Sequence, residues 1–388
     1  MISSQVDIRS GGHAQALRLV YVVTEDWFFV AHFLPLARAA RKAGFEIVVV
    51  TRVTAHGKEI EAEGFRIVPL VADRASFGVV KLLSTVIRLR SILAAESPTV
   101  VHAIALKSII LSGLAAIFVR KPGKVFSVTG LGYLWSDSRR FLGPFRLIVR
   151  QILQLISDGR KAIFTFENDD DCREFPKLKN RVVVGGWGIN SSDIVPRLDR
   201  PQAPIRVVYL GRMLRAKGIE LTVQAVELAR KKADIQLELW GTPDPGNLTS
   251  LTEEELRDFS LRDGIKWCGR AGDIAETWHR ADIAILLSER EGMPRSLIEA
   301  AAAAVPMVAF DVPGCRAIVR HELTGFLLPK DHVAAVADAI LMLAQDDTLR
   351  ERMGLEARND FEQRFSTHSV VPKIMDLYFE LVRHLKMQ

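Results

Sequence analysis

The stretch RLVYVVTEDWFFVAHFLPLARAARKAGFEIVVVT, residues 18–51, holds the pattern that indicates the fold. Its two ends, residues 18–24 and 46–51, are short runs of mostly apolar and β-branched residues, which is typical of buried strands. Between them, residues 33–43 carry apolar side chains at helical spacing, and Gly44 supplies a helix stop. Two buried strands joined by a helix form a parallel unit, so the segment predicts a parallel sheet covered on both faces.

The same alternation continues along the chain. In the first half it predicts strands at 66–70, 99–103, 124–128, 162–166 and 181–184, and helices at 79–96, 106–119 and 140–156. A Ser-, Asp- and Pro-rich segment at 190–204 predicts a linker, after which the pattern starts again with strands at 205–210, 236–239, 264–268, 282–287 and 306–310. We therefore predict an α/β protein with two Rossmann-like, doubly wound domains facing a central cleft, and a C-terminal helical tail.

The charge of the chain is concentrated in one region. The 388 residues carry a formal net charge of +6, and residues 118–161 alone hold nine cations and two anions, so the rest of the chain is close to neutral. A local basic patch interleaved with apolar residues indicates an anionic partner. Charge alone leaves nucleic acid, phospholipid headgroups and phosphorylated substrates open.

Cysteine use and apolar runs predict the compartment. Cys172, Cys268 and Cys315 have no metal-ligand spacing, and a sparse, odd number of cysteines fits a reducing compartment. Residues 1–17 lack the apolar core of a secretory signal, and the longest apolar run, residues 108–119, is too short to span a bilayer. We expect a cytoplasmic protein that is not integral to a membrane.

The segment SEREGMPRSLIEA, residues 288–300, leaves a predicted strand and enters a predicted helix. Gly292 allows a ligand to approach the backbone closely, and Pro294 suits the first helical turn, where its missing N–H costs nothing. The backbone amides of Ser296 and Leu297 would then form an anion site at the helix N-terminus.

Two carboxylates and two cations accompany this anion site. Glu291 would lie in the loop, and Glu299, separated from it by seven residues, would lie in the helix and accept from a pair of hydroxyls. The segment LGRMLRAKG, residues 210–218, also leaves a strand, and its Arg212 and Lys217 suit a diphosphate as a bidentate fork and a point charge. The alternative interpretation of both segments is ordinary surface charge beside a strand–turn–helix connection.

In chain order, with residues 210–218 before residues 288–300, the two segments resemble those of the retaining GT-B glycosyltransferases of family 4. These enzymes transfer a sugar from a nucleotide diphosphate donor. Further landmarks fall in the family's order over nearly the whole chain: residues 27–51, VHAIALKS at 101–108, VTGLGYLW at 128–135, GGWGINSSDIVP at 185–196, LELWGTPD at 237–244, residues 267–300 and HELTGFLLP at 321–329. The resemblance implies an acceptor-binding domain at residues 1–195 and a nucleotide-sugar-binding domain at residues 196–365. It also implies that a helix at 366–388 packs back on the first domain.

The resemblance also assigns roles to residues. It implies catalytic roles for four residues: His102, Arg212, Lys217 and Glu291. It implies that the donor is held by twelve: Arg212, Lys217, Gly269, Arg270, Ala271, Glu291, Gly292, Met293, Pro294, Ser296, Leu297 and Glu299. Among these, the two cations hold the diphosphate, Glu291 contacts sugar hydroxyls and Glu299 contacts the ribose. A purely structural role is the alternative for His102.

One departure concerns the loop after the first strand, where many family members carry two glycines and this chain has EDWFF at residues 25–29. This form resembles the subgroup that builds lipid-linked polysaccharide precursors. We expect the acceptor and an anionic membrane surface to meet six residues: Trp27, His32, Arg139, Arg140, Arg146 and Arg150. For His32, a half-buried helix position is an equal alternative to a catalytic role.

The resemblance implies retaining transfer from a nucleotide diphosphate sugar, with UDP favoured over GDP. The acceptor would be a lipid-linked oligosaccharide or a lipopolysaccharide or capsule precursor at the cytoplasmic membrane face. We expect no metal or other cofactor, because the cations and the helix N-terminus would stabilise the leaving diphosphate, and we expect no nucleic-acid partner. Two alternatives remain, a GT-B sugar-nucleotide 2-epimerase and a non-catalytic basic membrane-binding scaffold.

Overall fold

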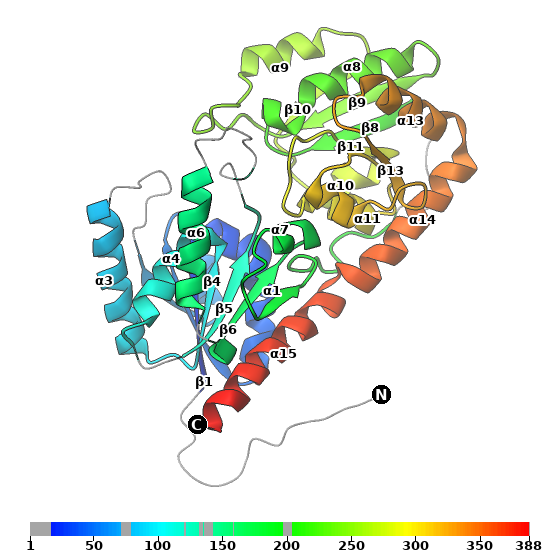
Figure 1. Ribbon diagram of the computed structural model, residues 1–388. Helices are drawn as coiled ribbons and strands as arrows, with labels where there is room; N and C mark the ends of the chain where they lie inside the picture. Colours follow the sequence, from blue (N-terminus) through cyan, green and yellow to red (C-terminus); the bar gives the residue numbers. More distant parts are fainter. Residues whose placement is uncertain are drawn as a thin grey trace, which may run out of the picture.

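The computed structural model describes residues 17–70, 79–119, 122–131, 135, 143–157, 159–196 and 204–387. These residues form two parallel sheets with helices around each (Figure 1). The first sheet has the strand order β3-β2-β1-β4-β5-β6-β7, and the second has the order β10-β9-β8-β11-β12-β13. In both sheets the order reverses direction at the first strand, as expected for doubly wound domains. The predicted pair of doubly wound α/β units is confirmed.

The first sheet and the helices around it come mostly from the N-terminal half. Its strands are β1 (Leu17–Glu25), β2 (Phe45–Arg52), β3 (Arg66–Pro69), β4 (Val100–Ile104), β5 (Gly123–Val128), β6 (Ala162–Phe166) and β7 (Arg181–Val183). Its helices are α1 (Asp26–Lys42), α2 (Gly57–Ala62), α3 (Val79–Glu96), α4 (Ala105–Ala116), α6 (Gly143–Ile156), α7 (Asp169–Arg173) and the 3-10 turn η2 (Gly159–Lys161).

The second sheet is built in the same way. Its strands are β8 (Ile205–Leu210), β9 (Ile235–Trp240), β10 (Ile265–Gly269), β11 (Ile283–Leu286), β12 (Met307–Phe310) and β13 (Gly325–Leu328). Its helical elements are η3 (Arg215–Lys217), α8 (Ile219–Arg230), α9 (Glu253–Ser260), α10 (Ile274–His279), α11 (Arg295–Ala302), α12 (Pro313–Ile318), α13 (Val333–Gln345) and α14 (Asp347–Arg364). The last helix, α15 (Thr367–Lys386), returns to the first sheet (Figure 1).

Alternation along β1 shows how the first sheet is buried on both faces. Leu19 and Tyr21 join a core with residues of α1 and α15, whereas Val20 and Val22 join a core with residues of α3, α4 and α6. Successive side chains on a strand point to opposite faces, so a strand covered on both faces needs apolar residues at every position. This requirement explains the uninterrupted apolar run from which the strand was predicted.

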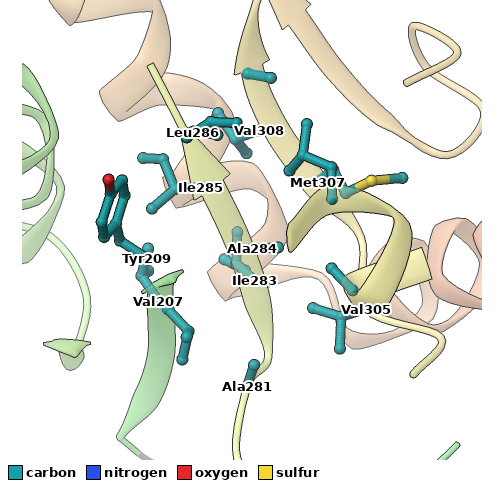
Figure 2. Close-up of a cluster of buried hydrophobic side chains, with 14 of the residues drawn as sticks. Val207, Tyr209, Ala281, Ile283, Ala284, Ile285, Leu286, Val305, Met307 and Val308 are labelled. Carbon is teal, nitrogen blue, oxygen red and sulfur yellow. The ribbon is translucent and has the colours of Figure 1, made fainter. Parts of the chain in front are cut away.

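The second sheet follows the same principle at its central strand. Figure 2 shows β11 with apolar side chains on both of its faces, between Val207 of β8 and Met307 of β12. All four residues of β11 are buried. The strand therefore ends in a rigid position, and the loop that follows it carries the segment 288–300.

The boundaries differ from the expected ones at several places. The helix expected at residues 33–43 begins at Asp26, directly after β1, and contains Pro35. Its N-cap, Glu25, makes no side-chain capping bond, so the usual sequence signal for a helix start is missing. The strand β13 and the short helices α2, α7 and α12 were not predicted. Of the predicted linker, residues 197–203 lie outside the described residues.

Within the described ranges, no helix combines the length and the apolar character needed to cross a bilayer.

Candidate active site

A cleft of about 450 Å³ lies where the carboxyl ends of strands from the two sheets face each other. This is where ligands bind in open α/β sheets. From the second sheet, the cleft is lined by Tyr209, Leu210, Gly211, Arg212, Lys217, Ile274, Leu286 and residues 291–296 and 299. From the first, it is lined by Phe28, His32, Thr129 and Glu167. Most of the predicted donor-binding residues therefore meet in one place.

Lys217 reaches the cleft because of a tight turn after β8. The next residue, Gly218, has a φ of 72°, and a Cβ there would lie 2.1 Å from the carbonyl oxygen of Leu287. Only glycine fits this close approach, which locks the turn against the end of β11. The ammonium of Lys217 is paired with Oε1 of Glu291, and the Ser288 hydroxyl donates to the same oxygen over 2.6 Å.

Arg212 lies at the more open side of the cleft, one residue after the glycine that follows β8. Its Nη1 donates to Oδ2 of Asp244 over 2.8 Å, and the arginine side chain is 58% exposed. An arginine at the end of a strand with an exposed guanidinium can exchange this carboxylate for a phosphate, because both offer the same pair of oxygens.

Glu299 is buried in the first turns of α11. It accepts from Nε of Arg295 over 2.7 Å and from Nε1 of Trp278 over 3.4 Å. Burial raises the pKa of Glu299, and the ion pair with Arg295 opposes that shift. Arg295 also donates to the carbonyl oxygen of Ala31 on α1, so this arginine joins the carboxylate to the first domain.

The wall from the first domain holds two titratable groups, His32 and Glu167. The His32 ring packs on Phe28 with ring centroids 4.4 Å apart. Burial, together with the positive charge of Arg295, lowers the pKa of His32 to about 3. His32 is therefore neutral at physiological pH and contributes a polar ring edge without charge.

Direct contacts join the two domains beside the cleft. Nδ2 of Asn168 donates to the carbonyl oxygen of Gly292 over 2.6 Å, and Arg290 pairs with Asp171 over 2.6 Å. Gly130 packs against Gly292, where an added Cβ would lie 2.8 Å from the Gly130 Cα. The loop that carries Glu291 is thus held from both sides.

His102 does not line the cleft. Its side chain has no exposed surface, with Nδ1 2.6 Å from the Tyr378 hydroxyl and Nε2 2.5 Å from the Ser127 hydroxyl. The chain of hydrogen bonds continues to Tyr21 and Thr165. Burial lowers the pKa of His102 to about 3, so the ring is neutral. In this arrangement His102 ties α15 to the first sheet and touches no ligand space, which supports the structural alternative.

Other predicted site residues also lie elsewhere. Gly269 ends β10, Arg270 and Ala271 follow it, and none of the three lines the cleft. The amide of Leu297 donates to the carbonyl oxygen of Pro294, so the predicted anion site keeps the amide of Ser296 and loses that of Leu297. Pro294 is the N-cap of α11 rather than a residue of its first turn.

The residues of the predicted acceptor and membrane patch are spread out. Trp27 is partly exposed on α1 and packs edge-on against Phe28. Arg146 and Arg150 lie on α6, where Arg150 pairs with Glu174 over 2.7 Å. Arg139 and Arg140 lie outside the described residues. Of the four described members of the set, His32 is the one that lines the cleft.

Sequence reasoning missed several lining residues, chiefly Glu167, Thr129 and Arg295. Glu167 and Thr129 each follow directly after the end of a parallel strand, β6 and β5. That position was the available signal, because the carboxyl ends of all strands in such a sheet meet at the ligand-binding edge. Arg295 was visible within the segment 288–300, but nothing in the sequence showed that its partners would be Glu299 and α1.

Comparison with known proteins identifies the family. The model for glycosyl transferases group 1 matches residues 204–346, and the model for glycosyl transferase 4-like proteins matches residues 18–166. The chain is a GT-B glycosyltransferase of family 4.

Two bacterial relatives of this glycosyltransferase match nearly its whole length. It is 22% identical over 373 residues to the N,N'-diacetylbacillosaminyl-diphospho-undecaprenol alpha-1,3-N-acetylgalactosaminyltransferase of Campylobacter jejuni, covering 92% of this chain and 97% of the relative. It is also 22% identical to the capsular polysaccharide biosynthesis glycosyltransferase CapM of Staphylococcus aureus, over 90% of this chain and 94% of the relative.

A similar solved structure is HepE from Anabaena in complex with UDP and glucose. It has a TM-score of 0.73 and 16% identity, covering 93% of this chain and 98% of that one. At this level of identity the similarity shows the fold of the glycosyltransferase alone. Arg212, Lys217, Glu291 and Glu299 all lie within the region matched by the group 1 model.

Proposed function

We propose that this glycosyltransferase moves a sugar from a UDP-sugar to a lipid-linked oligosaccharide, or to a lipopolysaccharide or capsule precursor, with retention of configuration. The observation that carries the proposal is the cleft in which Arg212, Lys217, Glu291 and Glu299 converge. Two cations and the N-terminal turn of α11 suit a diphosphate, and two carboxylates suit the hydroxyls of two sugars. UDP is the favoured nucleotide because HepE, which shares the fold, binds it.

The transfer step needs stabilisation of the leaving group above all. The acceptor oxygen forms a bond to the anomeric carbon while the bond from that carbon to the diphosphate oxygen breaks. The acceptor proton passes to the departing diphosphate, so no protein nucleophile is required. Lys217 and Arg212 stabilise the negative charge that develops on the leaving group, and they act most strongly in a cleft from which water is excluded.

We propose that this step requires no metal ion. Among the described residues, no group of three or more His, Cys, Asp or Glu side chains could hold one. The role of a cation is assigned to Arg212 and Lys217. Transfer that is unchanged by EDTA would agree with this assignment, and transfer that depends on added Mg²⁺ would contradict it.

The acceptor is proposed to be lipid-linked because the Campylobacter relative acts on a diphospho-undecaprenol-linked sugar. The surface of the first domain is compatible with a membrane. Its helices α3 and α6, which both pack on α4, expose apolar side chains at Val80, Leu83, Ile87, Phe145, Leu147, Ile148 and Leu155. Basic residues of α6, Arg146 and Arg150, lie among them. Such a combination favours an anionic membrane at the cytoplasmic face.

The donor assignment is tested by measuring thermal shifts with UDP- and GDP-sugars, followed by product analysis. A UDP-sugar that stabilises the protein and is consumed only when a polyprenyl diphosphate-linked sugar is present supports the proposal. A changed sugar nucleotide in the absence of any acceptor would instead indicate the 2-epimerase. Binding of no nucleotide sugar at all would leave only the scaffold.

Membrane attachment is tested with four substitutions, Arg139, Arg140, Arg146 and Arg150 to glutamine. Each basic residue near an anionic surface contributes about 1 kcal/mol, so pelleting with anionic vesicles should fall at least tenfold. The control replaces four exposed cations of the second domain, Lys231, Lys232, Arg257 and Arg262, and should pellet as the wild type does. Equal pelleting of both variants would contradict the assignment of this surface.

A further inference from the structure

Glu167 is a buried carboxyl group on the wall that the first domain contributes to the cleft. It follows β6 directly and is only 7% exposed. Its Oε1 accepts from Nε1 of Trp187 over 2.8 Å. Its Oε2 packs against Gly292 of the second domain, where an added Cβ would lie 2.9 Å away. Among the described residues, no side chain or backbone group makes a hydrogen bond to Oε2, although this oxygen belongs to a residue that lines the cleft.

Among the described residues, no cation forms an ion pair with Glu167. Asp171 on α7 is paired with Arg290, and Glu291 is paired with Lys217. Burial, opposed by the Trp187 hydrogen bond and reinforced by the charges of Asp171 and Glu291, raises the pKa of Glu167 to about 8. At neutral pH the group is therefore mostly protonated, and its free end can donate as well as accept a hydrogen bond.

A nine-tenths buried carboxyl with one free oxygen is costly unless something binds it. The position of Glu167 in the cleft indicates which ligand group would bind its free oxygen. Under the proposed function, Glu291, the residue before Gly292, contacts hydroxyl groups of the donor sugar. Glu167 stands on the opposite side of the same space, against Gly292. His102 is sealed off in its network with Tyr378, so the first domain does not offer it to the sugar.

We propose that Glu167 contacts the transferred sugar through a hydrogen bond to one of its hydroxyl groups and thereby contributes to the choice of sugar. The proposal rests on the proposed function, because it needs a nucleotide sugar as donor. It also has a structural consequence. The diphosphate is held by the second domain alone, whereas Glu167 belongs to the first, so the sugar is recognised by both domains together and the nucleotide by one.

The test compares UDP with UDP-sugars on wild type, Glu167→Ala and Glu167→Gln. Affinities for UDP, UDP-glucose, UDP-galactose, UDP-N-acetylglucosamine and UDP-N-acetylgalactosamine are measured by calorimetry. We expect Glu167→Ala to weaken the UDP-sugar that the wild type prefers by about tenfold and to leave UDP unchanged. Glu167→Gln keeps an acceptor for Trp187 and a donor toward the cleft, so it should lose less. Asp169→Asn, on an exposed neighbour in the same segment, is the charge control.

The outcomes separate the two proposals. Equal weakening of UDP and UDP-sugar, or no weakening of either, would overturn the assignment of Glu167 while leaving the donor class intact. A wild-type protein that binds UDP but none of the sugars would overturn both.

A second readout follows the burial of the group and does not depend on any ligand. Because the pKa is raised in the folded state, folding keeps a proton that the unfolded chain loses above its ordinary pKa, near 4.5. The stability contributed by Glu167 is therefore lost as pH rises from about 4.5 to about 8, and Glu167→Gln should lack that loss. If the melting temperatures of wild type and Glu167→Gln changed in parallel between pH 4.5 and pH 8, a buried, protonated Glu167 would be contradicted. The other titratable and charged groups around Glu167 are the same in both proteins, so their titration cancels in the comparison: His32, Asp171, Glu291, Arg295 and Lys373.

Discussion

Replacing Lys217 by alanine should lower the rate of sugar transfer by about a thousandfold and leave the protein folded. The ammonium is positioned by the turn at Gly218 and pairs with Glu291 inside the cleft, so it lies beside one of the predicted sugar contacts. Without it, the charge that develops on the leaving diphosphate would be met by Arg212 and by the amide of Ser296 only. The measurement is the transfer rate at saturating donor, with the melting temperature as a check on folding.

Arg215→Ala is the matched control for this change. Arg215 lies two residues earlier in the same turn, η3, and pairs with Glu220 and Glu255 outside the cleft. Its removal takes away the same charge from the same element, so a general electrostatic effect would appear in both variants. Wild-type turnover by the Lys217→Ala enzyme would remove Lys217 from the mechanism. A thousandfold loss in both variants would show that the turn, rather than the ammonium, is what matters.

The architecture could be predicted from the sequence because its cause is local. A strand buried on both faces must be apolar at successive positions, so β1, β2 and β11 stand out as short, mostly apolar runs. The turn at Gly218 and the segment around Glu291 could be recognised for a related reason: each combines a glycine, a strand end and charge within a few residues.

The rest of the site depends on packing between distant segments. Because β4 is covered on both sides, its sequence does not show to which face His102 points. The hydrogen-bond partner of His102, Tyr378, lies 276 positions away in the sequence. Glu167 is one of four acids in the segment ENDDD, residues 167–171, that follows β6. Its contacts with Gly292 and Trp187, which lie far from it in the sequence, single it out. The Leu297 amide is not free to bind an anion because it donates to the carbonyl oxygen of Pro294, and no sequence signal predicts this hydrogen bond.

Replacing Gly292 by alanine should reduce transfer by about a hundredfold with little effect on UDP affinity. The new Cβ would lie 2.8 Å from the Cα of Gly130 and 2.9 Å from Oε2 of Glu167, and the first of these atoms is backbone that cannot rotate away. Either the two domains move apart or the loop that carries Glu291 shifts, and both displace this carboxylate relative to the first domain. A displacement of about 1 Å at a reacting centre is enough for such a loss.

The measurements for Gly292→Ala are the transfer rate, the affinity for UDP and the radius of gyration by solution scattering. Gly246→Ala is the control, since a Cβ there would meet only ordinary contact with Asp244 at 3.7 Å. Each sheet has its own apolar core, so the melting temperature should change little. A transfer rate equal to that of the wild type would mean that catalysis does not need the contact between Gly130 and Gly292. Loss of transfer with unchanged UDP affinity would place the requirement in the approach of the two domains, because every charge assigned to the diphosphate belongs to the second domain alone.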